Sequence, residues 1–263
     1  MRNLKLTLAY DGHDFAGWQV QPDRLSVQGT LVSAFEHLTG EKTLPQGSGR
    51  TDAGVHALAQ IATVTTNSPI PVDNLIRALN DILPRSIRVL AAEEMPPEFH
   101  ARRSAIAKTY RYHIYRGAIC SPFQARYVYH HPYPLNESSM IQAAALVEGE
   151  HDFTSFAAVD PEKRKETLAA DQEAPAANPT LEPNNVRTIF LSQWQRHGDE
   201  LIYTVRGNGF LHHMVRNLVG TFLMVGKGSL SVADVRRILE LRNRSAAAAT
   251  APASGLFLVS VEY

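Results

Sequence analysis

The chain has 263 residues, of which 44% are hydrophobic and 20% charged, a composition typical of a globular protein with a sizeable core. Its 26 Lys and Arg residues balance its 26 Asp and Glu residues, so the net charge indicates no particular partner. The single cysteine, Cys120, excludes an intramolecular disulfide and a metal site built from several cysteines. The length suits one large domain or two modest ones.

Apolar and polar residues alternate over 1–10, which predicts a strand and lacks the apolar block of a signal peptide. No apolar run approaches the ~20 residues that a membrane-spanning helix needs. A single cysteine suits a reducing compartment. These features together predict a cytoplasmic protein with no membrane contact.

Two helices lie among the strands predicted for the first part of the chain. Ser26 has the position of a helix N-cap and Gly40 that of a residue just past a helix end, and a second helix opens at Pro71 or Val72. A rigid break at Pro96-Pro97 then precedes a domain boundary near residues 100–107. The predicted elements are a strand over 1–10, a helix over 26–38, a strand over 58–65, a helix over about 71–83 and a strand over 87–92.

The rest of the chain predicts a second set of strands and helices, interrupted by one biased segment. Residues 160–185 are charged and then rich in Ala and Pro, which predicts a surface insertion that is partly disordered. Ser231 and Asp234 have the spacing of a capping box. The predicted elements are a strand over 108–116, a helix over about 136–148, a hairpin over 186–206, helices over 212–225 and 231–241, and a strand over 256–263.

The turn signals between neighbouring strands favour antiparallel hairpins over parallel crossovers. We therefore predict an α+β fold of two domains, each with a largely antiparallel sheet flanked by helices. Residues 1–105 form the first domain, which carries a glycine-rich loop. Residues 106–263 form the second domain, which carries a basic surface and the insertion at 160–185.

Three glycines, Gly47, Gly49 and Gly54, surround a short polar segment just before the strand over 58–65. Glycine lets the backbone turn tightly and adopt positive φ. Arg50 lies two residues before Asp52, so in an extended segment both side chains point the same way and the guanidinium keeps the carboxylate ionised. Asp52 is therefore the candidate catalytic residue.

Two other interpretations of this loop remain open on the residues alone. Asp52 can instead cap a turn through the backbone, as in an Asx turn. The loop can also cradle a nucleotide phosphate, although it lacks both the Lys-Ser/Thr ending of a P-loop and the GxGxxG spacing.

Two stretches of the chain, 99–135 and 201–230, contain no Asp or Glu. The first carries six Lys and Arg residues interleaved with aromatic residues, and the second holds further basic residues beside His212 and His213. Cations bind phosphate and aromatic faces stack on unpaired bases, so both stretches predict binding of RNA or single-stranded nucleic acid. The alternative is a solvated strand face whose tyrosines belong to the core.

The sequence predicts no metal site. His130-His131 and His212-His213 are adjacent pairs, whose side chains diverge on a helix and on a strand. The HExxH, paired CxxC and GxSxG motifs of metal and nucleophile sites are missing from the sequence.

The segment Gly49–Ala57, with the sequence GRTDAGVHA, resembles the signature of the tRNA pseudouridine synthase A family. The resemblance extends over almost the whole chain. Further blocks match that family in the same order: Tyr10-Asp11-Gly12, Phe15–Gln19, Ser26–Gln28, Phe99–Arg102, Lys108–Tyr112, Asp152–Phe156, Phe210–Asn217 and Ala251–Leu256.

The resemblance implies an enzyme that isomerises uridine to pseudouridine at positions 38, 39 and 40 in the anticodon stem-loop of tRNAs. It also implies a homodimer with two α+β domains around a positively charged cleft, and no cofactor. Two departures stand out: the insertion at 160–185 is longer than usual, and Arg103 replaces a commonly aromatic residue.

Matching the motifs residue by residue assigns three roles. Asp52 is implied as the catalytic aspartate, Tyr110 as the residue that packs beside the target base, and Arg50 as the partner of the aspartate. We also predict RNA contacts from four residues in the matched basic blocks: Arg102, Arg111, Arg216 and His212.

The residue types suit this reaction, because moving the glycosidic bond from N1 to C5 of one uracil needs neither redox chemistry nor group transfer. A carboxylate can attack C1′, add to C6 or remove a sugar proton, and the residues do not choose among these. Two rival functions remain: a non-catalytic tRNA-binding or folding-chaperone protein, and a nucleotide-dependent enzyme.

Overall fold

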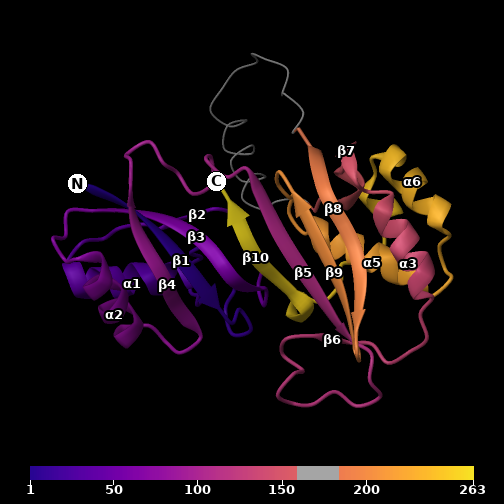
Figure 1. Ribbon diagram of the computed structural model, residues 1–263, viewed down its shortest axis with the longest axis horizontal. Coiled ribbons are helices and arrows are strands. Elements are labelled where there is room, and N and C mark those ends of the chain that lie inside the picture. The colour runs from indigo at the N-terminus through magenta and orange to yellow at the C-terminus, as the bar shows by residue number, and fades with distance from the viewer. Residues whose placement is uncertain (159–183) are drawn as a thin grey trace. The chain divides into compact units, whose positions relative to one another are not determined.

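A computed structural model describes residues 1–158 and 184–263 (Figure 1). The predicted insertion at 160–185 therefore lies almost wholly outside the described residues. The chain divides into two compact units. Unit 1 comprises 1–133, 194–208 and 252–263, and unit 2 comprises 134–193 and 209–251.

Unit 1 is built on a mixed sheet whose strand order is β4-β1-β3-β10-β5-β9 (Figure 1). Most neighbours are antiparallel, but β10 runs parallel to β3 and β6 parallel to β5. The strands are β1 (Arg2–Tyr10), β2 (Gln46–Gly47), β3 (His56–Thr66), β4 (Ile87–Met95), β5 (Ala107–Tyr115), β6 (Tyr129–His130), β9 (Glu200–Gly207) and β10 (Leu256–Glu262).

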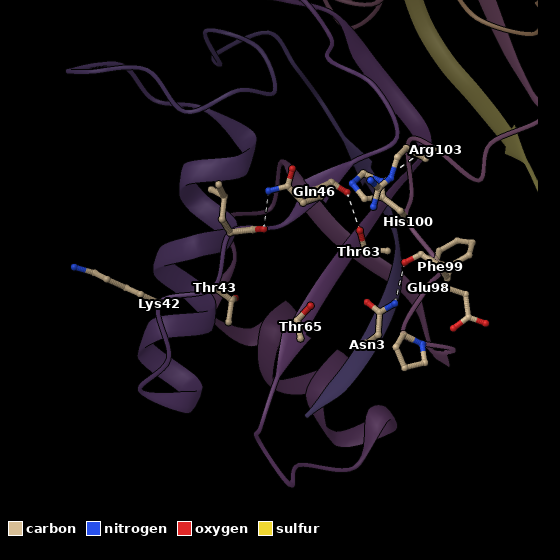
Figure 2. A pocket seen from close by; sticks show the side chains of 12 residues that line it. Asn3, Lys42, Thr43, Gln46, Thr63, Thr65, Glu98, Phe99, His100 and Arg103 are labelled. Carbon is tan, nitrogen blue, oxygen red and sulfur yellow. Dashed lines mark hydrogen bonds between the residues drawn. The ribbon is translucent and has the colours of Figure 1, made fainter.

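The alternation that predicts the first strand also places the core. Leu4, Leu6, Leu8 and Tyr10 are buried on one face of β1, while the residues between them are half-buried. The central strand β3 is buried over most of its length. The two-residue β2 pairs with the far part of β3, where the Thr63 hydroxyl donates to the Gln46 carbonyl oxygen at 3.4 Å (Figure 2).

Two helices complete unit 1, α1 (Val27–Thr39) and α2 (Val72–Ile82). Both predicted ends of α1 are confirmed: the Ser26 hydroxyl accepts from the amide of Gly29, and Gly40 adopts φ 73° just past the last turn. Pro71 is the N-cap of α2, so the helix opens at Val72. A single-turn 3₁₀ helix, Ala253–Gly255, leads into β10.

Unit 2 contains the helices α3 (Glu137–Ala145), α5 (Met214–Gly226) and α6 (Val232–Leu241), with two 3₁₀ turns at Thr154–Phe156 and Arg244–Ala246. Strand β7 (Gly149–Asp152) pairs antiparallel with the first residues of β8 (Val186–His197). The chain passes into unit 1 within β8.

The mostly apolar helix α5 is buried along most of its length, as its composition predicts. Its one buried amide side chain is satisfied: Asn217 donates to the Phe156 carbonyl oxygen at 2.7 Å and accepts from Thr250 at 2.7 Å. Gly220 lets the backbone at Ala249 pack directly against α5, because a Cβ on Gly220 would lie 2.0 Å from the Ala249 carbonyl oxygen. The capping box of Ser231 and Asp234 is confirmed at the start of α6.

The predicted α+β class with a largely antiparallel sheet is confirmed. The two compact units are not the consecutive stretches 1–105 and 106–263 of the sequence prediction, because β5, β9 and β10 join the sheet of β1 and β3. The helix predicted from His212 begins at Met214, since His213 adopts φ 59°. None of the helices in the described parts of the chain is long and apolar enough to cross a membrane.

Candidate active site

The segment that carries Asp52 is anchored at its first residues by a buried amide side chain of β3. Gln60 accepts the Ser48 hydroxyl at 2.6 Å and donates to the Gly49 carbonyl oxygen at 2.9 Å. Both Ser48 and Gln60 have no solvent exposure. The Ser48 amide also donates to the Ile61 carbonyl oxygen at 2.7 Å, so the loop leaves the sheet at a fixed point.

The middle of the loop packs backbone to backbone against residues 12–18. The Trp18 amide donates to the Thr51 carbonyl oxygen at 3.0 Å. Gly17 adopts φ +100°, and a Cβ there would lie 2.5 Å from that same oxygen. A Cβ on Gly12 would lie 1.9 Å from the Val55 carbonyl oxygen. Only glycine permits this close approach, so the two loops form one rigid layer.

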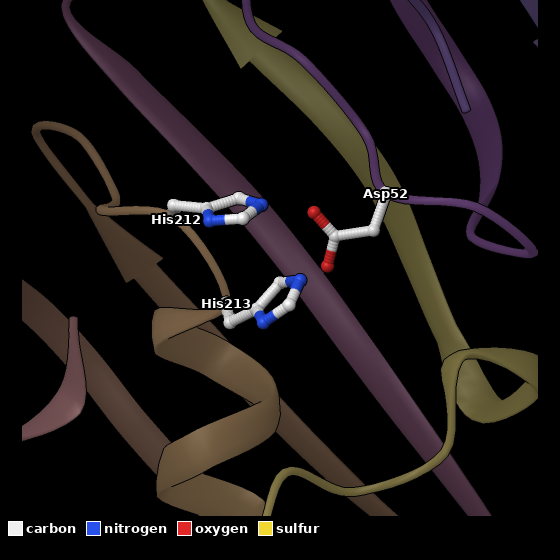
Figure 3. Close-up of side chains that lie close together, drawn as sticks. All are labelled: Asp52, His212 and His213. Carbon is white, nitrogen blue, oxygen red and sulfur yellow. The ribbon is translucent and has the colours of Figure 1, made fainter. Parts of the chain in front are cut away.

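Asp52 lies in a turn that the backbone closes: the Val55 amide donates to the Asp52 carbonyl oxygen at 3.1 Å, and Gly54 adopts φ +78°. The side chain is half-buried, and Figure 3 shows its carboxylate projecting from the loop. The carboxylate is therefore presented by a loop whose own turn is held by main-chain groups.

Tyr110 lies on β5 and is 8% exposed. Burial raises the pKa of its phenol well above the ordinary value, and electrostatic interactions with Tyr10 and with the Asp52 carboxylate raise the same pKa further. The Tyr110 phenol keeps its proton at neutral pH.

Tyr10 lies beneath the same loop and is 4% exposed. Its hydroxyl is 2.8 Å from the Thr51 hydroxyl. Burial raises the pKa of Tyr10 to about 12, although its contacts with Thr51 and Gln60 oppose the rise. The floor of the site is thus formed by neutral phenols, whose low polarity strengthens electrostatic interactions of the carboxylate.

Lys108 is a contact that sequence reasoning did not single out. It lies two residues before Tyr110 on β5, on the same face of the strand. Its ammonium donates to the Ser48 carbonyl oxygen at 2.6 Å, at the base of the loop. The i, i+2 spacing from Tyr110 is the sequence signal that could have identified this position.

His56 follows the loop at the start of β3 and is 1% exposed. Nδ1 lies 3.1 Å from the Gly12 amide and 3.1 Å from the Asp11 carboxylate, and Nε2 lies 3.0 Å from the Arg126 carbonyl oxygen. Burial lowers the pKa of the imidazole, although the nearby Asp11 carboxylate opposes this. His56 therefore ties the end of the loop to its surroundings as a neutral ring.

Arg50 is exposed and lines a cavity of about 360 Å³ together with Arg102 and Arg103. The structure thus brings together two of the predicted site residues, Arg50 and Arg102. Arg111 lies elsewhere: it follows Tyr110 directly on β5, so its side chain is on the opposite face of the strand, where it is exposed. Contacts of these residues with RNA stay predictions.

His212 and Arg216 belong to unit 2. The Arg216 guanidinium donates to the Ala251 carbonyl oxygen at 2.8 Å. The prediction that the side chains of His212 and His213 diverge is wrong, because their ring centroids lie 3.9 Å apart (Figure 3). The reason is local: His213 has a left-handed φ of 59°, which is neither helix nor strand geometry.

A family model described as tRNA pseudouridine synthase matches residues 7–102 and 143–263. A tRNA pseudouridine synthase A from Solibacter usitatus is 51% identical over 100% of both chains, and one from Brevibacillus brevis is 42% identical over 100% of both chains. A chain in a crystal structure of a Cbf5-Nop10-Gar1 complex is 11% identical, and the match covers 83% of this chain and 54% of that chain. Its TM-score of 0.30 is too low to support an argument.

Proposed function

Because this chain belongs to the tRNA pseudouridine synthase family, whose members are isomerases that convert uridine to pseudouridine, we propose that it modifies positions 38, 39 and 40 in the anticodon stem-loop of tRNAs. The observation that carries the proposal is the rigid loop, packed backbone to backbone against residues 12–18, that presents the half-buried carboxylate of Asp52. The residue assignments are part of the proposal.

The reaction breaks the bond between N1 and C1′ and forms a bond between C5 and C1′ of the same nucleotide. N1 gains a proton and C5 loses one, so the product is an isomer of the substrate. The target base must leave its stack for Asp52 to reach the sugar or C6. Asp52 then acts as nucleophile at C1′ or C6, or as the base that removes a sugar proton.

Tyr110 supplies an aromatic face for the extruded base. Since burial and the charge of Asp52 both raise the pKa of its phenol, we assign its hydroxyl no role as a base at neutral pH. Arg50, two residues before Asp52 and exposed, is assigned to the substrate phosphate or to the carboxylate itself. Its pairing with Asp52 rests on the resemblance to the family.

The experiment that tests the proposal uses Asp52→Asn with unmodified tRNA. Pseudouridine is mapped as reverse-transcription stops at carbodiimide adducts, and tRNA binding is measured in parallel. We expect no pseudouridine and retained binding, with Asp81→Asn as a control that removes an exposed carboxylate on α2. Full turnover by Asp52→Asn would exclude the assigned role, and binding by the unaltered protein without any pseudouridine would favour a non-catalytic RNA-binding protein.

The family resemblance also supports a homodimer located in the cytoplasm. Light scattering of the purified protein at several concentrations tests the dimer. A molecular mass equal to one chain of 29.1 kDa at all concentrations would contradict it.

A further inference from the structure

A small buried network lies beneath the loop that carries Asp52, and the proposed chemistry does not use it. Its central group is the phenol of Tyr10, the last residue of β1. The Tyr10 hydroxyl lies 2.8 Å from the Thr51 hydroxyl, so one of the two donates to the other, and it also contacts the side chain of Gln60. These three residues are at most 6% exposed, so a substrate does not reach them.

The sheet of unit 1 holds Tyr10 from both sides. In the two ladders, Tyr10 lies opposite Ala57 of β3 and opposite Ile87 of β4, so its main chain belongs to an inner strand. The ring of Tyr10 also lies against that of Trp18, which is 1% exposed, with the two centroids 6.3 Å apart. The Tyr10 hydroxyl is therefore a fixed point against which the loop is set.

Gln60 extends this network to the start of the loop. Its side chain accepts from the Ser48 hydroxyl at 2.6 Å and donates to the Gly49 carbonyl oxygen at 2.9 Å. Tyr10 is thus linked to the loop at two places, through Gln60 to its first residues and directly to Thr51. Two links fix the course of the chain between them better than either would alone.

Thr51 is the residue through which this network reaches Asp52. It is buried, whereas Arg50 before it is exposed and Asp52 after it is half-buried, so the Thr51 side chain points into the unit while its neighbours face outward. Its carbonyl oxygen accepts from the Trp18 amide at 3.0 Å. The hydroxyl and the carbonyl group of Thr51 are held separately, which leaves little freedom of rotation in the main chain that leads to Asp52.

We infer that Tyr10 is a positioning residue for the reaction: by holding the Thr51 hydroxyl, it fixes the direction in which the Asp52 carboxylate is presented. The inference rests on the proposed function, because it takes Asp52 as the reacting group. A misplacement of about 1 Å can reduce a rate roughly 100-fold, so a hydroxyl that never touches the substrate can still control turnover. The competing interpretation is that the contact only stabilises the fold.

The test is a double-mutant cycle of Tyr10→Phe, Thr51→Val and the two together, which separates positioning from stability. Each single variant leaves one hydroxyl buried without its partner, which destabilises the protein. The double variant replaces both groups by apolar ones of the same shape, which is nearly neutral for stability. We therefore expect the midpoint of urea unfolding to fall in each single variant and to recover in the double variant, which keeps a folded protein for the assay.

Turnover should not recover with stability. We expect kcat for pseudouridine formation to fall about tenfold in each single variant and about tenfold, rather than about 100-fold, in the double variant, because the two hydroxyls act as one unit. Thr51→Ser keeps the hydroxyl and should keep kcat within about threefold. The dissociation constant for an anticodon stem-loop RNA should not change, since neither hydroxyl is accessible to the RNA.

The pH dependence of kcat distinguishes positioning from proton transfer. Burial raises the pKa of Tyr10 to about 12, so its phenol is neutral at both pH 6.5 and pH 8.5. Tyr10→Phe should therefore lower kcat by the same factor at the two pH values. Different factors would assign a proton-transfer role to Tyr10 and overturn the positioning role.

Tyr263→Phe is the matched control, because it removes a tyrosine hydroxyl of unit 1 that donates to the Ala101 carbonyl oxygen at 2.8 Å, outside the loop. It should keep its kcat. Full kcat in the folded double variant would show that the contact of Tyr10 with Thr51 serves stability alone. Asp52→Asn is assayed in parallel: if it forms pseudouridine, the proposed function fails, whereas an inactive Asp52→Asn beside a fully active double variant overturns only the role of Tyr10.

Discussion

Gly17 offers the sharpest test of how the loop that carries Asp52 is held in place. A methyl group added at Gly17 destabilises the protein in two ways, through backbone strain and through steric overlap, and the two effects can be measured separately. Gly17→Ala places an L residue at φ +100° and a Cβ 2.5 Å from the Thr51 carbonyl oxygen. Gly40→Ala provides the matched control, since Gly40 also has positive φ (+73°) but nothing lies within 4 Å of its would-be Cβ.

The left-handed conformation costs an L residue about 1–2 kcal/mol, so the free energy of unfolding should fall by no more than this in Gly40→Ala. At Gly17 the overlap with the Thr51 oxygen adds about 1–3 kcal/mol, as over-packing does in cores. The free energy of unfolding should therefore fall by roughly 2–5 kcal/mol, unless the loop shifts away and relieves the overlap. A shift would displace Asp52, the next residue after Thr51.

The loss of stability is measured by urea unfolding, and a displacement of Asp52 is measured as the initial rate of pseudouridine formation by the same preparations. We expect Gly40→Ala to keep its rate, whereas Gly17→Ala loses either stability or at least tenfold in rate, since small displacements of reacting groups are costly. A Gly17→Ala protein with the stability of Gly40→Ala and full activity would refute the proposed packing of the two loops.

Three further predictions concern the residues around the loop. Tyr110→Phe should retain most of the activity, measured as pseudouridine yield, and Tyr110→Ala should lose it, because the ring rather than the hydroxyl is assigned to the contact with the base. Equal losses in the two variants would reverse that assignment. Lys108→Met should lower the free energy of urea unfolding by about 1.5–3 kcal/mol, since it removes a charge-assisted hydrogen bond to Ser48, and an unchanged midpoint would contradict this. His56 makes the free energy of unfolding depend on pH. Burial lowers its pKa in the folded protein below the 6.5 of an unfolded histidine, so the unfolded state binds more protons just below pH 6.5. Stability is therefore lost as the pH falls through that window. The loss, at most about 1.4 kcal/mol per pH unit, should be smaller in His56→Gln when both proteins are unfolded in urea at pH 7.5 and 5.5. Parallel pH curves for the two proteins would show that His56 does not contribute.

The pH window assigned to His56 is separate from that of its neighbour Asp11. Burial, the largest influence on Asp11, raises the pKa of its carboxyl, but the His13 amide, the Tyr127 hydroxyl and the charges of His56 and Arg126 together bring it below 3.8. The stability that Asp11 contributes is present above pH 3.8 and is lost only as the pH falls through the lowered value. A change in the free energy of unfolding between pH 7.5 and pH 5.5 therefore reports on histidine rather than on the Asp11 carboxyl.

Local sequence signals determined most of the secondary structure. Caps are recognisable because they satisfy backbone groups within a few residues, which is why Ser26, Gly40 and the Ser231–Asp234 box all appear where the sequence predicts them. The same holds for the alternating strand β1, whose apolar side chains share one face. Asp52 was predicted as the catalytic residue from its own motif, since glycines and a charged pair on a loop are visible in the chain itself.

The tertiary structure alone decided what surrounds that motif. The parallel pairing of β10 with β3 joins residues about 200 apart in the chain, and no local pattern encodes such a partner. The need for glycine at 12 and 17 is likewise set by carbonyl oxygens of Val55 and Thr51, more than 30 residues away. The geometry of His213 depends on a backbone conformation that its residue type does not predict.

Sequence therefore determined which groups can do the chemistry, and the fold decided which of them meet. Arg111 and Tyr110 are adjacent in a basic, aromatic stretch, yet the pleat of β5 sends them to opposite faces. Lys108, with no motif of its own, reaches the base of the Asp52 loop because it shares a face with Tyr110. The physical reason is that residue type sets charge and proton affinity, whereas distance and burial arise only when segments far apart in the chain pack together.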